Sequence, residues 1–199
     1  STISLTNTGT VTLTGLFDFN NLTLSSGTYN FSSSGTTLTV TNSFTPGGST
    51  VGYTYAGALA TTIAPLSYNH LTIGAGTNFG SSGTISCVNF SLSGTFAPAA
   101  DVTISGTWTN SGTYNQSAGT TTFTGTATLG GTTTFWNLTI SGSVNGGLGI
   151  TTTIAGTSFT LTGTFTKSTS TISLTNTGTV TLTGIFDFNN LTLGSGTYN

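Results

Sequence analysis

The sequence predicts an all-β fold, a β-helix or β-solenoid whose coils hold roughly 20 residues each. Three observations predict it. Apolar and hydroxyl residues alternate along short segments, a six-residue motif returns along the chain, and the first 30 residues return almost unchanged at the end.

The alternation identifies the strands. Residues 10–14, 37–41, 101–105 and 159–162 alternate apolar side chains with threonine or serine. Alternation over short runs is typical of half-buried strands, and threonine suits them because its branched β-carbon favours extended backbone while its hydroxyl faces water. Ser-Gly, Gly-Gly and Ala-Gly pairs between these segments mark turns. We therefore expect strands joined by short turns along the whole chain.

The long repeat indicates a tandem array. Residues 1–30 and 170–199 are identical at 28 of 30 positions and differ at Leu16/Ile185 and Ser25/Gly194. A fixed internal period is the signature of repeat architecture. We interpret residues 1–199 as one continuous solenoid segment of an array with period 169, which we expect to continue along its axis with neighbouring repeats or subunits. Residues 44–66, with two prolines and an alanine-rich run, are expected to form an irregular loop or insertion.

The short motif reads aromatic-x-Asn-Leu-Thr-Leu/Ile, and a degenerate copy begins at Cys87. The step from Leu71 to Phe90 is 19 residues, as is the step from Ile3 to Leu22. Because strand side chains alternate between two faces, we expect the first residue of each copy to point inward and the residue before it to point outward. The inward set is Phe19, Tyr68, Cys87, Phe135 and Phe188, and the outward set is Asp18, Ser67, Ser86, Thr134 and Asp187.

A string of β-sandwich or immunoglobulin-like domains is the alternative architecture. It too would show turn signals every 8–12 residues or so. The recurring motif favours the solenoid, in which each coil forms hydrogen bonds with its neighbours alone.

The composition excludes several classes of function. The chain has one Lys or Arg and three Asp or Glu, so charged residues make up 2%. One basic residue cannot displace the counterions of a nucleic acid, and three scattered carboxylates cannot form a calcium site or a hydrolytic pair. No apolar run is long enough to span a membrane as a helix. We predict that the protein is not an enzyme and has no catalytic, cofactor-binding or metal-binding residues, no cofactor and no nucleic-acid partner.

The individual ionisable residues fit this prediction. Asp18 and Asp187 should lie on the surface, too far apart to form a pair. Asp101 precedes a strand and is interpreted as a turn residue, and Lys167 as a lone surface charge. His70 takes the place that Asn21, Asn89, Asn137 and Asn190 hold in the other motif copies, which favours a turn with stacked side chains over a general base or a metal ligand.

Cysteine and tryptophan give weaker signals. Cys87 aligns with the core aromatic position, where a lone cysteine behaves as a small apolar residue. Trp136 is expected at a corner, partly exposed, and Trp136 and Trp108 are weak candidates for a sugar-binding platform.

Residues 131–142, Gly-Thr-Thr-Thr-Phe-Trp-Asn-Leu-Thr-Ile-Ser-Gly, and the preceding segment 122–131 resemble the repeats of large secreted β-helical surface proteins of bacteria and archaea, which include adhesins and filament-like proteins. The resemblance implies an extracellular location and a structural or adhesive role. We expect a segment of an extracellular fibre, stalk or surface filament whose main partner is itself. The alternative is an adhesin that binds surface glycans, and a remote alternative is ice binding by ladders of threonine.

Overall fold

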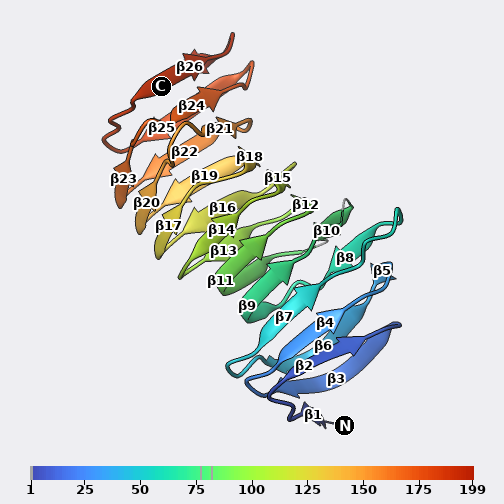
Figure 1. Ribbon diagram of the computed structural model, residues 1–199. Helices are drawn as coiled ribbons and strands as arrows, with labels where there is room; N and C mark the ends of the chain where they lie inside the picture. The colour runs from blue at the N-terminus through green and yellow to red at the C-terminus, as the bar shows by residue number, and fades with distance from the viewer. Residues whose placement is uncertain (1, 77, 82) are drawn as a thin grey trace.

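A computed structural model describes residues 2–76, 78–81 and 83–199. In this part of the chain the structure is all-β, and parallel strands stack into a β-solenoid of about 10 turns. Figure 1 shows the coils following one another in sequence order, with the two chain ends at opposite ends of the stack.

One side of the solenoid is a nine-stranded parallel sheet, which we call the first face. It consists of β5 (Gly35–Thr36), β8 (Thr61–Ile63), β10 (Phe79–Ser81), β12 (Thr95–Pro98), β15 (Thr113–Asn115), β18 (Thr132–Phe135), β21 (Thr151–Ile154), β24 (Thr171–Leu174) and β26 (Asn190–Leu193).

A larger sheet bends around the solenoid and supplies two further faces. Its strands are β2 (Thr10–Leu13), β4 (Thr28–Phe31), β7 (Thr50–Tyr53), β9 (Ser67–Ile73), β11 (Ile85–Leu92), β13 (Val102–Ile104), β14 (Trp108–Asn110), β16 (Thr120–Phe123), β19 (Asn137–Ile140), β22 (Ser158–Leu161), β25 (Thr179–Thr183) and β27 (Thr197–Tyr198). The bend lies in β11, because its first half pairs with β13 and its second half with β14.

We call the second face the side that contains the first halves of β9 and β11 and continues from β13 to β27. The third face contains β2, β4, β7, the second halves of β9 and β11, and β14. Toward the C-terminus it is succeeded by β17 (Thr126–Thr128), β20 (Ser143–Asn145) and β23 (Thr164–Thr166). A separate three-stranded sheet at the N-terminal end contains β1 (Thr2–Leu5), β3 (Phe17–Leu24) and β6 (Leu38–Thr45).

The strand registers confirm the solenoid and its coil length. Leu71 pairs with Phe90, and Ile3 with Leu22, as the 19-residue step predicts. The coil length varies along the stack, from the 17 residues between Ile85 and its partner Val102 to the 26 between Gly35 and its partner Thr61. Such parallel stacking of successive coils is incompatible with a string of antiparallel sandwich domains.

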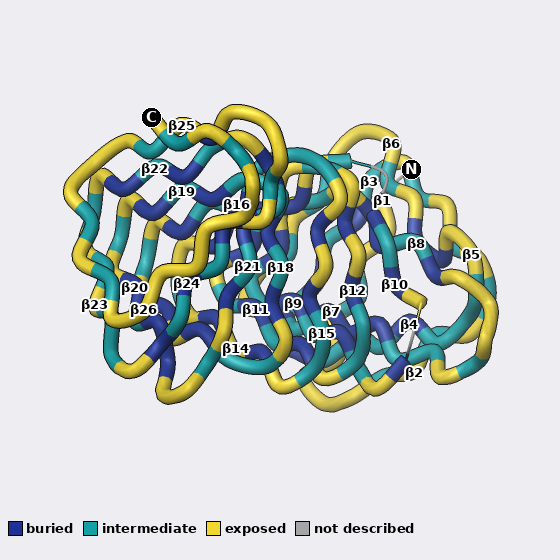
Figure 2. The backbone as a smooth tube through the Cα atoms, turned by 90° about the horizontal axis from the view of Figure 1, so that it is seen from above, coloured by how far each residue is buried: buried dark blue, intermediate teal, exposed yellow. Residues whose placement is uncertain are grey.

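The core is a continuous column of apolar side chains from Leu22 to Val180. Figure 2 shows buried positions alternating with intermediate ones along strands such as β19 and β22. An aromatic cluster fills the middle of the column, where the ring of Trp108 lies 4.8 Å from that of Phe90 and 5.1 Å from that of Tyr114. The cluster packs beside the buried Leu, Ile and Val side chains that make up most of the column.

The corners are made of stacked glycines. A β-carbon on Gly142 would overlap the backbone carbonyl of Gly125, and one on Gly163 would overlap the carbonyl of Gly142. The Ser-Gly and Thr-Gly pairs of the sequence are therefore places where successive coils approach too closely for any side chain.

Some threonines point into the core, which the alternation did not predict. Thr121, Thr133 and Thr152 are buried on the inner side of their strands. Thr133 Oγ1 donates to Gly130 O at 2.9 Å and accepts a bond from Asn110 Nδ2 at 3.0 Å. Thr152 Oγ1 finds no hydrogen-bond partner among the described residues.

This difference predicts opposite effects for one substitution. Thr152→Val removes an unpaired buried hydroxyl and should raise the free energy of unfolding by about 1 kcal/mol. Thr133→Val removes the hydrogen bonds of Thr133 Oγ1 with Gly130 O and Asn110 Nδ2, which leaves Asn110 Nδ2 with its longer bond to Thr132 O at 3.5 Å, and should lower the free energy of unfolding by about 1–2 kcal/mol. Urea unfolding of the two variants measures both effects, and equal effects of the same sign would contradict the assignment.

One interpretation of the sequence needs correction. The segment 44–66 is not one irregular insertion, because it contains β7 and β8, and Val51, Tyr53 and Ile63 are buried. Within it, residues 46–49, 54–60 and 64–66 lack strand structure. The reason is that Gly52 and the prolines break the alternation in the sequence without breaking the stacking of the coils.

The structure also shows where the copies of the short motif lie. The inward and outward positions of the motif are as predicted: Tyr68, Cys87 and Phe135 are buried, Phe19 and Phe188 are half-buried against the core, and no member of the outward set is buried. The five inward residues do not form one column, however. Tyr68 stacks on Cys87, whereas Phe19 pairs with Val40 in another sheet and Phe135 pairs with Ile154 on the first face.

Candidate functional site

The outer surface of the second face carries an unbroken column of hydroxyl groups. Each residue pairs in register with the next, and Ser86 Oγ donates to Ser67 Oγ at 2.7 Å. The column is Ser67, Ser86, Thr103, Thr122, Thr139, Thr160 and Thr183. Neighbouring hydroxyls are thus set at the spacing of parallel strands, about 4.8 Å.

The first face carries two shorter columns of the same kind. Thr95, Thr113 and Thr132 are stacked in register, and Thr151 and Thr171 are paired further along. Thr134, Thr153 and Ser173 form the neighbouring column, two residues along each strand. The exterior is therefore an ordered array of neutral hydroxyl groups.

Asparagine side chains bridge successive coils at a corner, as the motif predicted. Asn89 Oδ1 accepts hydrogen bonds from Thr107 N at 2.9 Å and Thr107 Oγ1 at 2.8 Å. His70 lies in register with Asn89, and its Nδ1 is 2.8 Å from Asn89 Nδ2. His70 therefore takes part in the ladder that its position in the motif indicates.

The charged residues are dispersed, with one exception that the sequence analysis missed. Asp18 is exposed, and the Asp101 carboxylate accepts a hydrogen bond from Thr120 N at 2.8 Å just before β13, as expected of a turn residue. Lys167 is not a lone charge, because its Nζ is 2.7 Å from Asp187 Oδ1. The two residues are 20 positions apart, one coil length, and that spacing was the available signal. Both side chains are exposed, so the pair adds little to stability.

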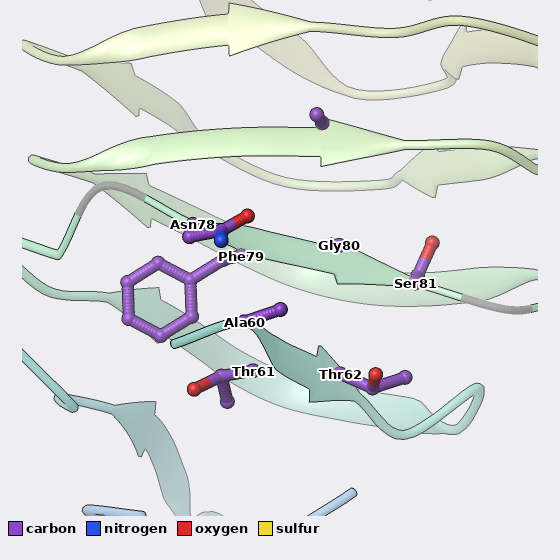
Figure 3. Close-up of a pocket in the computed structure, with 8 residues that line it drawn as sticks. Ala60, Thr61, Thr62, Asn78, Phe79, Gly80 and Ser81 are labelled. Carbon is purple, nitrogen blue, oxygen red and sulfur yellow. The ribbon is translucent and has the colours of Figure 1, made fainter. Parts of the chain in front are cut away.

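The two tryptophans do not form a common platform. Trp108 is buried within the aromatic cluster, while Trp136 is half-buried at the corner between β18 and β19, as predicted for it. A shallow depression of about 230 Å³ lies between β8 and β10 (Figure 3). It is lined by Thr61, Thr62, Asn78 and Gly80, among others, and no lining residue is ionisable.

Cys87 is a free, buried cysteine, as predicted. Burial raises the pKa of its thiol from 9.0 to about 12. Burial likewise raises the pKa of Tyr53 from 10.0 to about 12, an effect that its hydrogen bonds with Tyr68 and Ala64 partly offset. These groups are therefore neutral at physiological pH and unsuited to act as nucleophiles.

The thiol predicts a loss of stability in alkali. Below about pH 9 it is protonated in both the folded and the unfolded chain; between about pH 9 and 12 the unfolded chain alone loses the proton, so the free energy of unfolding falls as pH rises. The slope approaches at most about 1.4 kcal/mol per pH unit. Urea midpoints from about pH 8 to 10 measure it. Cys87→Ala should flatten the slope below pH 10, and an unchanged slope would contradict this account.

The two ends of the solenoid expose strand edges and apolar side chains. The repeated strand sequence Asn-Leu-Thr-Leu is covered at β3 and open at β26, so that Leu22 is 1% exposed and its counterpart Leu191 is 42% exposed. At the other end the order is reversed: Ile3 of β1 is 39% exposed and its counterpart Ile172 of β24 is 1% exposed. The first copy is therefore uncovered by any neighbouring coil on its N-terminal side, and the second copy is uncovered on its C-terminal side.

Over residues 2–76, 78–81 and 83–199 no group of three or more His, Cys, Asp or Glu side chains could hold a metal ion. No long apolar helix that could cross a membrane occurs in the same residues. Scans against protein families, curated proteins and solved structures found no match.

Proposed function

We propose that the protein is a structural segment of an extracellular fibre, stalk or surface filament. The observation that carries the proposal is the pair of open strand edges, at which Ile3, Leu191 and Leu193 are exposed. Unpaired parallel edges accept further strands, and apolar residues at an edge favour their addition. Axial growth of the solenoid pairs the edge of β26 and buries Leu191 and Leu193.

The exterior supports the same proposal. The ionisable side chains Asp18, His70, Asp101 and Lys167 lie on different coils, and the ion pair Lys167–Asp187 is exposed. A surface with so little charge allows solenoids to pack closely, since repulsion between like charges is weak. A mechanical role without catalysis fits this distribution.

The first experiment asks whether the 199-residue chain associates. Sedimentation velocity over a range of concentrations should show growth beyond the 20.0 kDa monomer, and electron microscopy should show unbranched filaments. A species that stays monomeric at every concentration would contradict the proposal. Leu191→Asp, on an exposed residue, is the matched variant that should reduce association without unfolding the chain.

A second candidate function is binding to a regular surface, such as a glycan array or ice. The hydroxyl column from Ser67 to Thr183 favours it, because its groups repeat at the strand spacing on one face. Replacement of Thr122 and Thr139, in the middle of the column, by lysine would break the array while keeping the fold. Glycan-array binding or thermal hysteresis that disappears in this variant would support the candidate, and the absence of both activities in the unchanged protein would exclude it.

A further inference from the structure

The two copies of the 30-residue repeat have the same internal pairing. Thr2 pairs with Asn21 in the first copy, and Thr171 pairs with Asn190 in the second. Tyr29 Oη donates to Leu5 O at 2.7 Å, and Tyr198 Oη donates to Leu174 O at 3.2 Å. Each copy is therefore the same two-coil unit, and the two differ in what covers them.

Strands β6 and β7 cover the first copy. Strand β6 lies on β3, with Phe17 opposite Leu38 and Asn21 opposite Ser43, and β7 lies on β4. Side chains fix this register, because Asn21 Oδ1 accepts hydrogen bonds from Asn42 Nδ2 at 2.7 Å and Ser43 Oγ at 2.9 Å. Asn190 has the same neighbours in sequence as Asn21, so β26 and β27 present the same surface without its cover.

We propose that the open edge of β26 and β27 binds β6 and β7 of a second copy of this chain. In doing so, residues 170–199 of one copy replace residues 1–30 of the next. This proposal rests on the proposed fibre function and specifies its junction. Residues 170–199 fit this position because they are identical to residues 1–30 at 28 of 30 positions. The pairs Asn190–Ser43 and Leu191–Phe44 therefore form in place of Asn21–Ser43 and Leu22–Phe44.

The junction covers the exposed apolar residues of the C-terminal end. In the first copy, Leu22 and Leu24 are each 1% exposed beneath β6, whereas Leu191 and Leu193 are 42% and 50% exposed. Direct pairing of β26 with β1 of another copy has no equivalent in the structure. The counterpart of β26 is β3, whose partner on the corresponding side is β6, whereas β1 lies on the opposite side of β3.

The junction also turns each copy by one face relative to the last. Strands β24 and β26 belong to the first face, and β25 and β27 to the second. The counterparts of β26 and β27 in the first copy, β3 and β4, lie one face further round the coil. Strand β3 pairs with β6, which lies in the chain between β5 of the first face and β7 of the third face, and β4 pairs with β7. Both strands of the unit are displaced in the same sense, as a rigid junction requires.

Disulfide cross-linking tests the junction in the 199-residue chain. Paired residues of adjacent strands are about 4.8 Å apart, within the reach of a disulfide, and Ser43 and Asn190 are both exposed. The double variant Ser43→Cys/Asn190→Cys should give a ladder of disulfide-linked multimers under mild oxidation. The native Cys87 is buried and does not compete.

Two matched controls define register and geometry. Ser43→Cys/Asn189→Cys shifts one cysteine by a residue to the other side of the strand and should form at least tenfold fewer links. Thr2→Cys/Asn190→Cys forms links if β26 meets β1 directly. Multimers from the first variant alone support the proposal; equal links at positions 189 and 190, or links through position 2, overturn it.

The same substitution in the two copies gives a second readout. Leu191→Asp places a charge on the edge of β26 and should abolish the disulfide links between positions 43 and 190. Leu22→Asp loosens residues 1–30 from β6 and should raise the yield of links severalfold. A lower yield of disulfide links in both variants would overturn the proposal. Filaments that form without Ser43–Asn190 links would leave the fibre function standing and refute this junction, whereas a protein that neither links nor associates would refute both.

Discussion

Trp108→Ala should lower the free energy of unfolding by about 3–5 kcal/mol, the range for loss of a large aromatic side chain from a packed core. The Trp108 ring contacts those of Phe90, Tyr114, Phe123 and Phe135, which come from both neighbouring coils and from the opposite face. Its removal leaves a cavity that stacked backbones cannot collapse to fill. Urea unfolding followed by circular dichroism measures the loss.

Trp108→Phe is the matched control. Trp108 Nε1 has no hydrogen-bond partner among the described residues, so phenylalanine keeps most of the ring contacts and removes an unpaired donor. We expect this variant to lose about 1 kcal/mol or less. Equal losses for the alanine and phenylalanine variants would show that the ring contacts do not hold the middle of the solenoid together.

Gly142→Ala should destabilise the protein by about 2–3 kcal/mol, although it adds a single methyl group. That methyl group would overlap the carbonyls of Gly125 and Thr124 in the coil below. The overlap involves backbone atoms, so relief requires the two coils to separate locally and lengthens their hydrogen bonds, among them Ser143 N to Gly125 O at 2.9 Å.

Gly80→Ala provides the comparison for this prediction. Gly80 lies within β10, where an added β-carbon meets nothing closer than Ala97 O at 3.6 Å. We expect its stability to stay within about 0.5 kcal/mol of the unchanged protein. Thermal unfolding of both variants, followed by circular dichroism, measures the difference, and similar midpoints would contradict the close approach of the coils at Gly142.

The sequence predicted the fold because the features that define it are local. Alternation places Val11, Val102 and Ile104 on the inner side of their strands, and the 19-residue step pairs Leu71 with Phe90. The coil length elsewhere varies too much for a motif copy to specify its face. For that reason Phe19, Tyr68 and Phe135 lie in different sheets despite their shared motif.

The sequence predicted the positions of some polar residues but not the contacts between loops of successive coils. His70 and Asp101 are placed as their motif and strand contexts indicate. The ion pair of Lys167 with Asp187 depends on two loops of adjacent coils, which alternation does not describe. The inward Thr152 was missed because threonine is as compatible with a strand interior as with its exterior, and packing rather than pattern decides between them.

Cryo-electron microscopy of the assembled 199-residue chain tests the fibre proposal most directly. The predicted result is an unbranched filament with strands perpendicular to its axis, about 4.8 Å apart, and an axial repeat of about 40 Å with a turn of one face per repeat. That repeat corresponds to the 169 residues between equivalent positions of the two copies. End-to-end stacking of whole molecules of about 10 turns would instead give about 50 Å. Monomeric particles at all concentrations, or filaments whose strands run along the axis, would contradict the proposal.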